Sequence, residues 1–181
     1  MINAVSREPD GRLEVPSSIM AAIRAAAQQA WPAECCGLLV GEGPRAFMPE
    51  GQGGVWQVHR AVPSANVAKE DGAHGQHDRF EVDPEVLLAT HRAARAEGLA
   101  IIGHYHSHPN APAAPSLIDL AHAFYGEHAW LIVSVSGPGA TPGEIIATAW
   151  RPLMPDPTFP AIAFLPMTLQ TVTESAKKPL A

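Results

Sequence analysis

The sequence predicts an α+β fold in which a single mixed β-sheet is flanked by helices. Two observations lead to this fold class. Segments typical of strands and segments typical of helices follow one another without the strict alternation of a parallel α/β fold. The chain has 181 residues, of which 46% are hydrophobic, and this is enough for one domain with a buried core.

Helices are expected in three segments. The stretch "PSSIMAAIRAAAQQAWP" (16–32) is rich in alanine, and Ser17 or Ser18 is a suitable N-cap. The stretch "DPEVLLATHRAARAEG" (83–98) has proline in its first turn and glycine at its end, an arrangement typical of helix boundaries. The third is "SLIDLAHAFYG" (116–126), which begins with a serine after a proline-rich loop.

Strands are expected where apolar residues alternate or run together between turn-forming residues. These strands are residues 12–15, 35–41, 55–62, 99–108, 129–136 and 144–152. The polar, glycine-containing stretch 64–79 is expected to be a loop. We assign residues 1–152 to one domain and the proline-rich residues 153–181 to an irregular C-terminal tail.

Charge and composition exclude several classes of function. The net charge is −6 and no basic run exceeds Lys177–Lys178, so no nucleic-acid partner is expected. No apolar stretch reaches the ~18–20 residues of a membrane span, and the first residues lack an apolar signal core. Cys35 and Cys36 are adjacent, so no disulfide framework is expected and a cytoplasmic location is favoured. The oligomeric state stays open, a homodimer included.

The stretch "GHYHSHPNAPAAPSLID" (103–119) holds the candidate metal ligands. His106 and His108 are two residues apart on a predicted strand, so their side chains leave the same face. Imidazole is the commonest zinc ligand. Asp119 lies in the first turn of the predicted helix, after a loop restricted by three prolines, and can point back towards the strand. Two imidazoles and one carboxylate are the ligand set of a catalytic zinc site with one open position.

A second interpretation of the same residues stays open at this point. Ser116 and Asp119 have the spacing of a helix capping box, with aspartate in place of the usual glutamate or glutamine. Histidines on a strand can also be ordinary surface residues. Residue types and spacing alone therefore leave a metal site and a capped helix equally open.

The spacing nevertheless resembles a known motif. His106-x-His108, seven residues, Ser116, two residues and Asp119 are similar to the metal-binding motif of the JAMM (also MPN-plus or JAB) metalloprotease family. The resemblance covers about residues 12–152. It implies a JAMM/MPN-like sandwich similar to cytidine deaminases, with one Zn²⁺ per chain.

Two further segments support the resemblance. "PAECCGLLVG" (32–41) resembles the family's Glu-x-Cys-Gly-x-Leu segment and places Glu34 at the catalytic glutamate. "RFEVDP" (79–84) before a helix resembles the bacterial branch of the family. His104 departs from the pattern, since the family usually has an aromatic or aliphatic residue there, and we expect it either in a pocket wall or as a hydrogen-bond donor that supports a metal ligand.

The resemblance also implies a function. It assigns zinc to His106, His108 and Asp119, proton transfer to Glu34 and stabilisation of the oxyanion to Ser116. The expected activity is a zinc-dependent peptidase or isopeptidase that hydrolyses the bond after the C-terminal Gly-Gly of a ubiquitin-like or sulfur-carrier protein. The alternative is a catalytically inactive MPN-type scaffold or interaction module.

Overall fold

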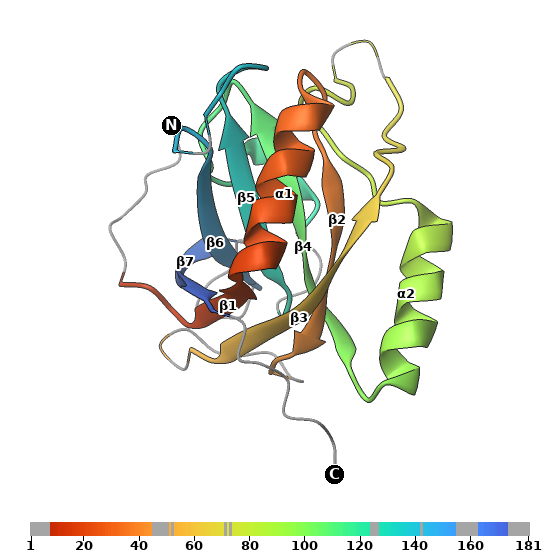
Figure 1. The fold of residues 1–181 in the computed structure, drawn as a ribbon, viewed down its shortest axis with the longest axis vertical. Coiled ribbons are helices and arrows are strands. Elements are labelled where there is room, and N and C mark those ends of the chain that lie inside the picture. The colour runs from red at the N-terminus through yellow and green to blue at the C-terminus, as the bar shows by residue number, and fades with distance from the viewer. Residues whose placement is uncertain are drawn as a thin grey trace.

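The structure, a computed structural model, describes residues 8–44, 51, 53–70, 72, 74–123, 127–141, 143–154 and 163–173 (Figure 1). Its helices are α1 (Ser17–Ala30), α2 (Pro84–Ala96) and α3 (Leu117–Ala121). Its strands are β1 (Arg12–Pro16), β2 (Cys36–Glu42), β3 (Val55–Ser64), β4 (Ala100–Pro109), β5 (Ala129–Val135), β6 (Ile146–Leu153) and β7 (Ala163–Val172).

The seven strands form one mixed sheet that closes on itself. Their order is β1-β3-β2-β4-β5-β6-β7, and β1 then pairs with β7. The pairs β1–β3, β1–β7 and β4–β5 are parallel, and the others are antiparallel. The predicted mixed α+β class is confirmed. The predicted sheet flanked by helices is wrong, because Arg12 pairs with Val55 on one side and with Thr168 on the other, which closes a barrel.

The closing strand comes from the segment that the sequence assigned to the C-terminal tail. Residues 163–172 form β7, which pairs with both β1 and β6. Pro166 pairs with Trp150 inside this strand, although proline cannot donate a backbone hydrogen bond. Residues 155–162 and 174–181 lie outside the described part of the chain, and the domain boundary at residue 152 stays a prediction.

The helices begin and end close to the predicted residues, with two differences. The residue before α1 is Pro16, and no side chain caps this helix, so the predicted serine N-cap is wrong. The α3 helix ends at Ala121, earlier than predicted. Asp83 caps α2, since its Oδ1 accepts a 2.8 Å hydrogen bond from the Glu85 amide. None of the described helices has the length and apolar character that a membrane crossing requires.

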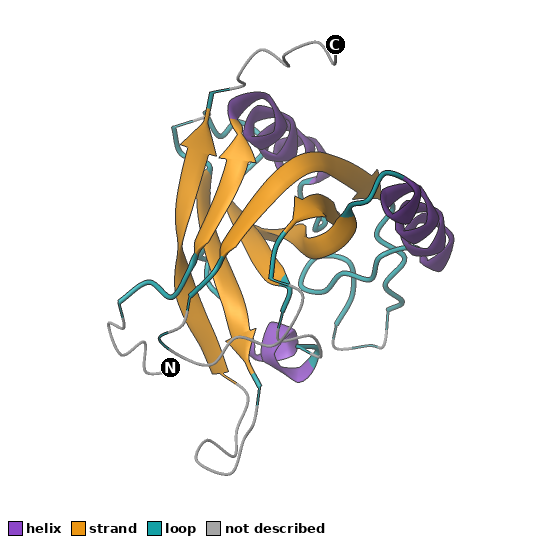
Figure 2. Ribbon diagram, turned by 90° about the horizontal axis from the view of Figure 1, so that it is seen from below, coloured by secondary structure: helices purple, strands orange, loops and turns teal. Residues whose placement is uncertain are grey.

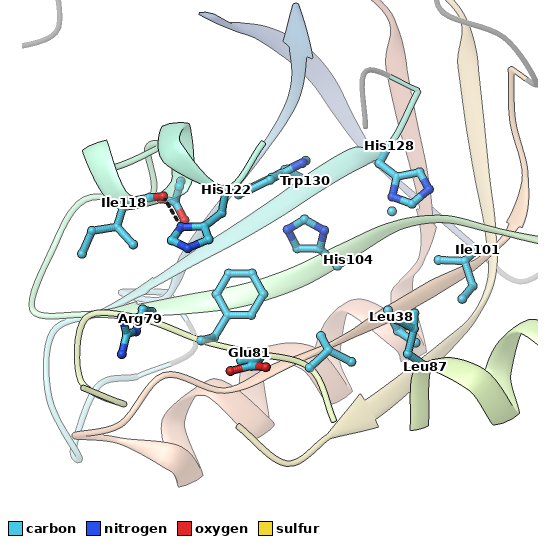
Figure 3. A pocket seen from close by; sticks show the side chains of 14 residues that line it. Leu38, Arg79, Glu81, Leu87, Ile101, His104, Ile118, His122, His128 and Trp130 are labelled. Atoms are coloured by element: carbon cyan, nitrogen blue, oxygen red, sulfur yellow. Dashed lines mark hydrogen bonds between the residues drawn. The ribbon is translucent and has the colours of Figure 1, made fainter. Parts of the chain in front are cut away.

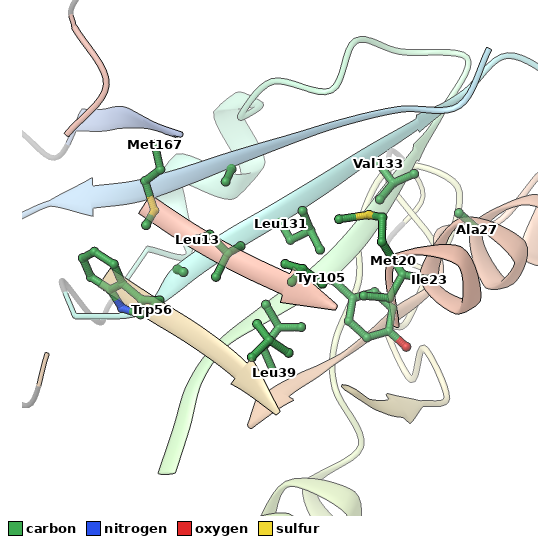
Figure 4. Close-up of a cluster of buried hydrophobic side chains, with 14 of the residues drawn as sticks. Leu13, Met20, Ile23, Ala27, Leu39, Trp56, Tyr105, Leu131, Val133 and Met167 are labelled. Atoms are coloured by element: carbon green, nitrogen blue, oxygen red, sulfur yellow. The ribbon is translucent and has the colours of Figure 1, made fainter. Parts of the chain in front are cut away.

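The core lies on both faces of the curved sheet. Successive residues of β2 point to opposite faces, as the period of a strand requires. Leu39 therefore packs in the main cluster beneath α1, whereas Leu38 and Val40 pack in a smaller cluster with Ala94 of α2. Figure 4 shows Leu39 with Tyr105, Leu131, Met20 and other members of the main cluster. Figure 2 shows the two longer helices on different sides of the strands.

Candidate metal centre and active site

The register between β2 and β4 brings Glu34 to the end of β4 that carries the histidines. Cys36 pairs with His106 in an antiparallel ladder. The pairing continues past the end of β2, because the Ser107 amide donates to the Cys35 carbonyl at 3.0 Å and the Cys35 amide donates to Ser107 Oγ at 2.8 Å. Glu34, one residue earlier, thus lies beside His108, although the two are far apart in sequence.

Three predicted ligands converge in the structure. The Nε2 atoms of His106 and His108 lie 3.0 Å apart, and Asp119 Oδ1 and Oδ2 lie 3.2 Å and 3.3 Å from them. A tetrahedral zinc site with bonds of about 2.0–2.1 Å requires ligand atoms about 3.3 Å apart. All three residues are buried. The separations and the donor set therefore fit a metal ion with three protein ligands.

The two imidazoles are held in different ways. His108 Nδ1 lies 2.8 Å from the Pro112 carbonyl oxygen, which can only accept, so Nδ1 carries the proton. With the proton on Nδ1, a neutral His108 ring would present the lone pair of Nε2 to a metal ion held beside Asp119 and His106. His106 Nδ1 is buried and has no hydrogen-bond partner among the described residues. Its ring instead stacks on Phe80, with centroids 4.4 Å apart and an angle of 19° between the planes.

Ser116 and Asp119 form the capping box that the sequence left open, and they do so next to the metal ligands. Ser116 Oγ accepts a 3.1 Å hydrogen bond from the Asp119 amide, and Asp119 Oδ2 accepts a 2.6 Å bond from the Ser116 amide. The cap fixes the carboxylate in the direction of the histidines. Because Ser116 Oγ accepts here, its hydroxyl proton stays available for another acceptor.

The cluster is electrostatically coupled. Burial alone would raise the pKa of Asp119, but hydrogen bonds from His106 and His108 outweigh burial and the pKa is lowered. Burial would lower the pKa of His108, but Asp119 outweighs it and the pKa is raised. The pKa of His106 is lowered, because it is fully buried and burial outweighs the carboxylate. Asp119 is thus held ionised, which suits a cation ligand.

The pKa of Glu34 is shifted in the opposite direction to that of Asp119. The residue is 4% exposed, and this burial raises the pKa of its carboxyl group from the ordinary 4.5 to about 8. His108 lowers the pKa, while Asp119 and Asp78 raise it. Two carboxyl groups in one site therefore have pKa values that are pushed apart, which is the pattern of a site with separate acid–base and charge-stabilising roles.

The pKa of Glu34 predicts a pH-dependent stability of the metal-free protein. Between pH 4.5 and about 8, the folded state keeps a proton on Glu34 that the unfolded state has lost. Glu34 therefore makes the free energy of unfolding fall as pH rises through this window, by up to about 1.4 kcal/mol per pH unit. Urea titrations of chelator-treated protein across the window should show a steeper fall for wild type than for Glu34→Gln. Parallel curves for the two proteins would contradict the assignment.

A cavity of about 300 Å³ opens beside the metal ligands. Asp119 and His104 line it, together with apolar side chains of β2, β4, β5 and α2 such as Leu38, Trp130 and Leu87. Figure 3 shows His104 and Trp130 side by side in this lining. Burial holds the pKa of His104 well below its ordinary value, so the ring is neutral. His104 thus lies in a pocket wall, one of the two roles expected from the sequence.

Two residues of the site were not predicted from the sequence. Phe80 belongs to the quoted segment "RFEVDP", but no role followed from its type or position. Asn66 lies in the predicted loop, and its side chain donates to the Glu34 carbonyl at 3.1 Å and to the Arg79 carbonyl at 3.0 Å. A polar residue of a loop carries no signal that could have identified these contacts.

A comparison with protein families agrees with the geometry. The family described as prokaryotic homologs of the JAB domain matches residues 16–152. The chain belongs to the prokaryotic JAB family. The match contains the three candidate metal ligands, Glu34 and Ser116, and it confirms the resemblance seen in the sequence.

Relatives of this JAB-domain protein have been named in archaea and bacteria. It is 32% identical to the desampylase of Haloferax volcanii over 120 residues, which are 66% of this chain and 76% of that protein. It is 35% identical to a probable TtuB-protein conjugate cleaving protease of Thermus thermophilus over 74 residues, 39% of this chain and 47% of that protein.

Two solution structures share the fold of this JAB-domain protein. A Desulfitobacterium hafniense protein superposes with a TM-score of 0.63 and 26% identity, over 90% of this chain and 95% of that one. A Salinibacter ruber protein does so with a TM-score of 0.51 and 25% identity, over 92% of this chain and 94% of that one.

Proposed function

We propose that this JAB-domain chain is a zinc-dependent isopeptidase that hydrolyses the bond after the C-terminal Gly-Gly of a ubiquitin-like or sulfur-carrier protein. The observation that carries the proposal is the convergence of His106, His108 and Asp119 at tetrahedral separations, beside the buried carboxyl group of Glu34. The relatives support the substrate class, since one is named as a protease that cleaves a protein conjugate.

Each residue of the site has a distinct task. His106, His108 and Asp119 would hold Zn²⁺, which supplies a Lewis acid and lowers the pKa of a water molecule towards neutrality. Glu34 takes the proton of the attacking water and passes it to the leaving amine, a task for a carboxyl group whose pKa lies near the working pH. The Ser116 hydroxyl would donate a hydrogen bond to the oxyanion that develops on the scissile carbonyl.

We infer that the substrate approaches between residues 64–79 and residues 109–115, and that these two loops favour glycine in the substrate. On one side, the Gln76 carbonyl accepts a hydrogen bond from the Glu34 amide at 2.6 Å. On the other side, the Pro112 carbonyl holds His108. A peptide that passes between these loops is favoured when it carries glycine, because glycine has no Cβ and needs the least space.

The proposal predicts cleavage at one position. We would extend a ubiquitin-like carrier from the same genome by several residues past Gly-Gly and incubate it with zinc-loaded protein. Mass spectrometry should find a cut directly after Gly-Gly and none in a carrier in which Gly-Gly is replaced by Ala-Ala.

The other outcomes have separate meanings. Equal cleavage of the Ala-Ala version, or cleavage of casein at unrelated positions, would indicate a general peptidase. No cleavage of any carrier by protein with one bound zinc would favour the inactive scaffold.

A further inference from the structure

The Asn66 side chain links two parts of the active site that are far apart in sequence. Its Nδ2 donates to the carbonyl oxygens of Glu34 at 3.1 Å and Arg79 at 3.0 Å. Its Oδ1 accepts from the amides of Ala68 and Glu81, both at 3.1 Å. An amide offers two donor hydrogens and two acceptor lone pairs, so every hydrogen-bonding position of this side chain is used.

The first link holds the backbone of the proton-transfer residue. Glu34 precedes β2 and therefore lacks the support of that strand's own ladder. Its amide donates to the Gln76 carbonyl at 2.6 Å, and its carbonyl accepts from Asn66. Gln76 Nε2 in turn donates to the Asn66 carbonyl at 2.7 Å. Both peptide groups of Glu34 are therefore fixed by Asn66 and its hydrogen-bonded neighbour.

The second link holds the peptides on both sides of Phe80. Asn66 accepts from the amide of Glu81 and donates to the carbonyl of Arg79, the two residues that flank Phe80. An isolated bridge between Asn66 and Val82 adds to this contact. With its backbone fixed in this way, Phe80 stacks on the ring of His106 at 4.4 Å.

This stacking replaces a support that metal-binding histidines usually have. Such a histidine commonly donates its second ring N–H to a carbonyl or carboxylate, which fixes the ring orientation. His108 follows this rule through Pro112. His106 Nδ1 finds no partner in the described part of the chain, so the face of Phe80 sets the plane of the ring.

We propose that Asn66 is a positioning residue of this active site, which aligns the carboxyl group of Glu34 and, through Phe80, the imidazole of His106. The proposal rests on the function proposed above for Glu34 and His106. It assigns Asn66 no contact with substrate. Its side chain acts on two groups at once, so its loss should affect both metal affinity and turnover.

The test uses the isosteric change Asn66→Asp, which removes both donors and keeps both acceptor positions. The zinc dissociation constant, measured by competition with a chromogenic chelator, should rise about 10- to 100-fold, the usual effect of losing a supporting contact. At saturating zinc, kcat for the extended carrier should fall by about 10- to 100-fold with KM little changed, because Glu34 is misaligned. Asn66→Ser removes the same donors without adding charge and should behave alike.

Two controls separate positioning from general destabilisation. Gln28 Nε2 also donates to backbone carbonyls, at 2.7 Å to Ala140 and 3.5 Å to Pro138, but in a different region of the fold. Gln28→Glu is therefore a matched loss of donors, and its zinc affinity and kcat should equal those of wild type. Phe80→Leu should weaken zinc binding. Phe80→Tyr keeps the ring and should bind zinc as tightly as wild type.

The double variant Asn66→Asp/Phe80→Leu decides whether the two residues act through the same ring. Its loss of zinc affinity should be smaller than the sum of the single losses. Additive losses, or wild-type zinc affinity and kcat in both Asn66 variants, would overturn the proposal. The zinc measurements need no substrate. If wild-type protein binds zinc but cleaves no carrier, the proposed function is wrong. The zinc affinities of the variants still test the link from Asn66 to His106 in that case.

Discussion

Asp119→Ala is expected to abolish zinc binding and, with it, all hydrolysis of a carrier conjugate. The carboxylate is the only negatively charged member of the ligand set, and its two oxygens lie 3.2 Å and 3.3 Å from the Nε2 atoms of His106 and His108. Without it, two neutral imidazoles remain, too few for a catalytic zinc site. Zinc content should fall from about one equivalent per chain to background. The loss in kcat/KM should exceed roughly 100-fold, the upper end of what losing a residue that only supports a ligand causes.

The measurement has to separate loss of the metal from loss of the helix cap. Asp119→Asn keeps an oxygen that can accept from the Ser116 amide but removes the charge, so it should keep the fold and still lose zinc. Asp83→Ala is the matched control, because Asp83 caps α2 through a 2.8 Å bond to the Glu85 amide and does not belong to the cluster. It should lower stability by about 1 kcal/mol and keep zinc. If His106→Ala/Asp119→Ala protein keeps one equivalent of zinc by elemental analysis, the ligand assignment is wrong.

The metal cluster could be anticipated because its ligands are close in sequence. His106 and His108 share a strand face by the period of a strand, and the loop before the helix of Asp119 spans only residues 110–116. The capping box was equally visible. The two interpretations turned out to be compatible, since the cap is what directs the carboxylate of Asp119 towards the histidines.

The closure of the barrel could not be anticipated in the same way. It depends on residues 12–16 pairing with residues 163–172, two segments at opposite ends of the chain. The residue types of neither segment indicate which strand it pairs with, and the proline at position 166 favours an irregular tail. The sheet therefore closes through a contact that only the three-dimensional structure reveals.

The hydrogen bonds that support the site residues could not be predicted from the sequence either. The acceptor for His108 is a backbone carbonyl, that of Pro112, and every residue has one. The role of Asn66 depends on where the chain returns after β3, which brings its amide between Glu34 and Arg79. The position of Glu34 itself became clear once the antiparallel register of β2 on β4 was known.

Glu34 is well suited to move a proton because its carboxyl group is buried next to the three converging metal ligands but is not one of them. Burial raises its pKa to about 8, and Asp119 adds to the shift. A cation held by His106, His108 and Asp119 would bring the pKa back towards neutrality, because a nearby positive charge favours the ionised carboxylate. The group would then be poised to accept a proton from water and to return it to an amine.

Glu34→Gln should therefore keep the fold and one equivalent of zinc while kcat falls by at least about 100-fold, the usual contribution of a general base. The glutamine side chain has the same size as glutamate but has no basic oxygen of comparable strength, so proton transfer is lost without a cavity. The control is Glu97→Gln, which removes a surface carboxylate that pairs with Arg60 at 2.9 Å and should leave kcat unchanged. Single-turnover assays on the extended carrier, with zinc content measured in the same samples, provide the comparison. Near-normal turnover of zinc-loaded Glu34→Gln would assign the proton transfer to another group.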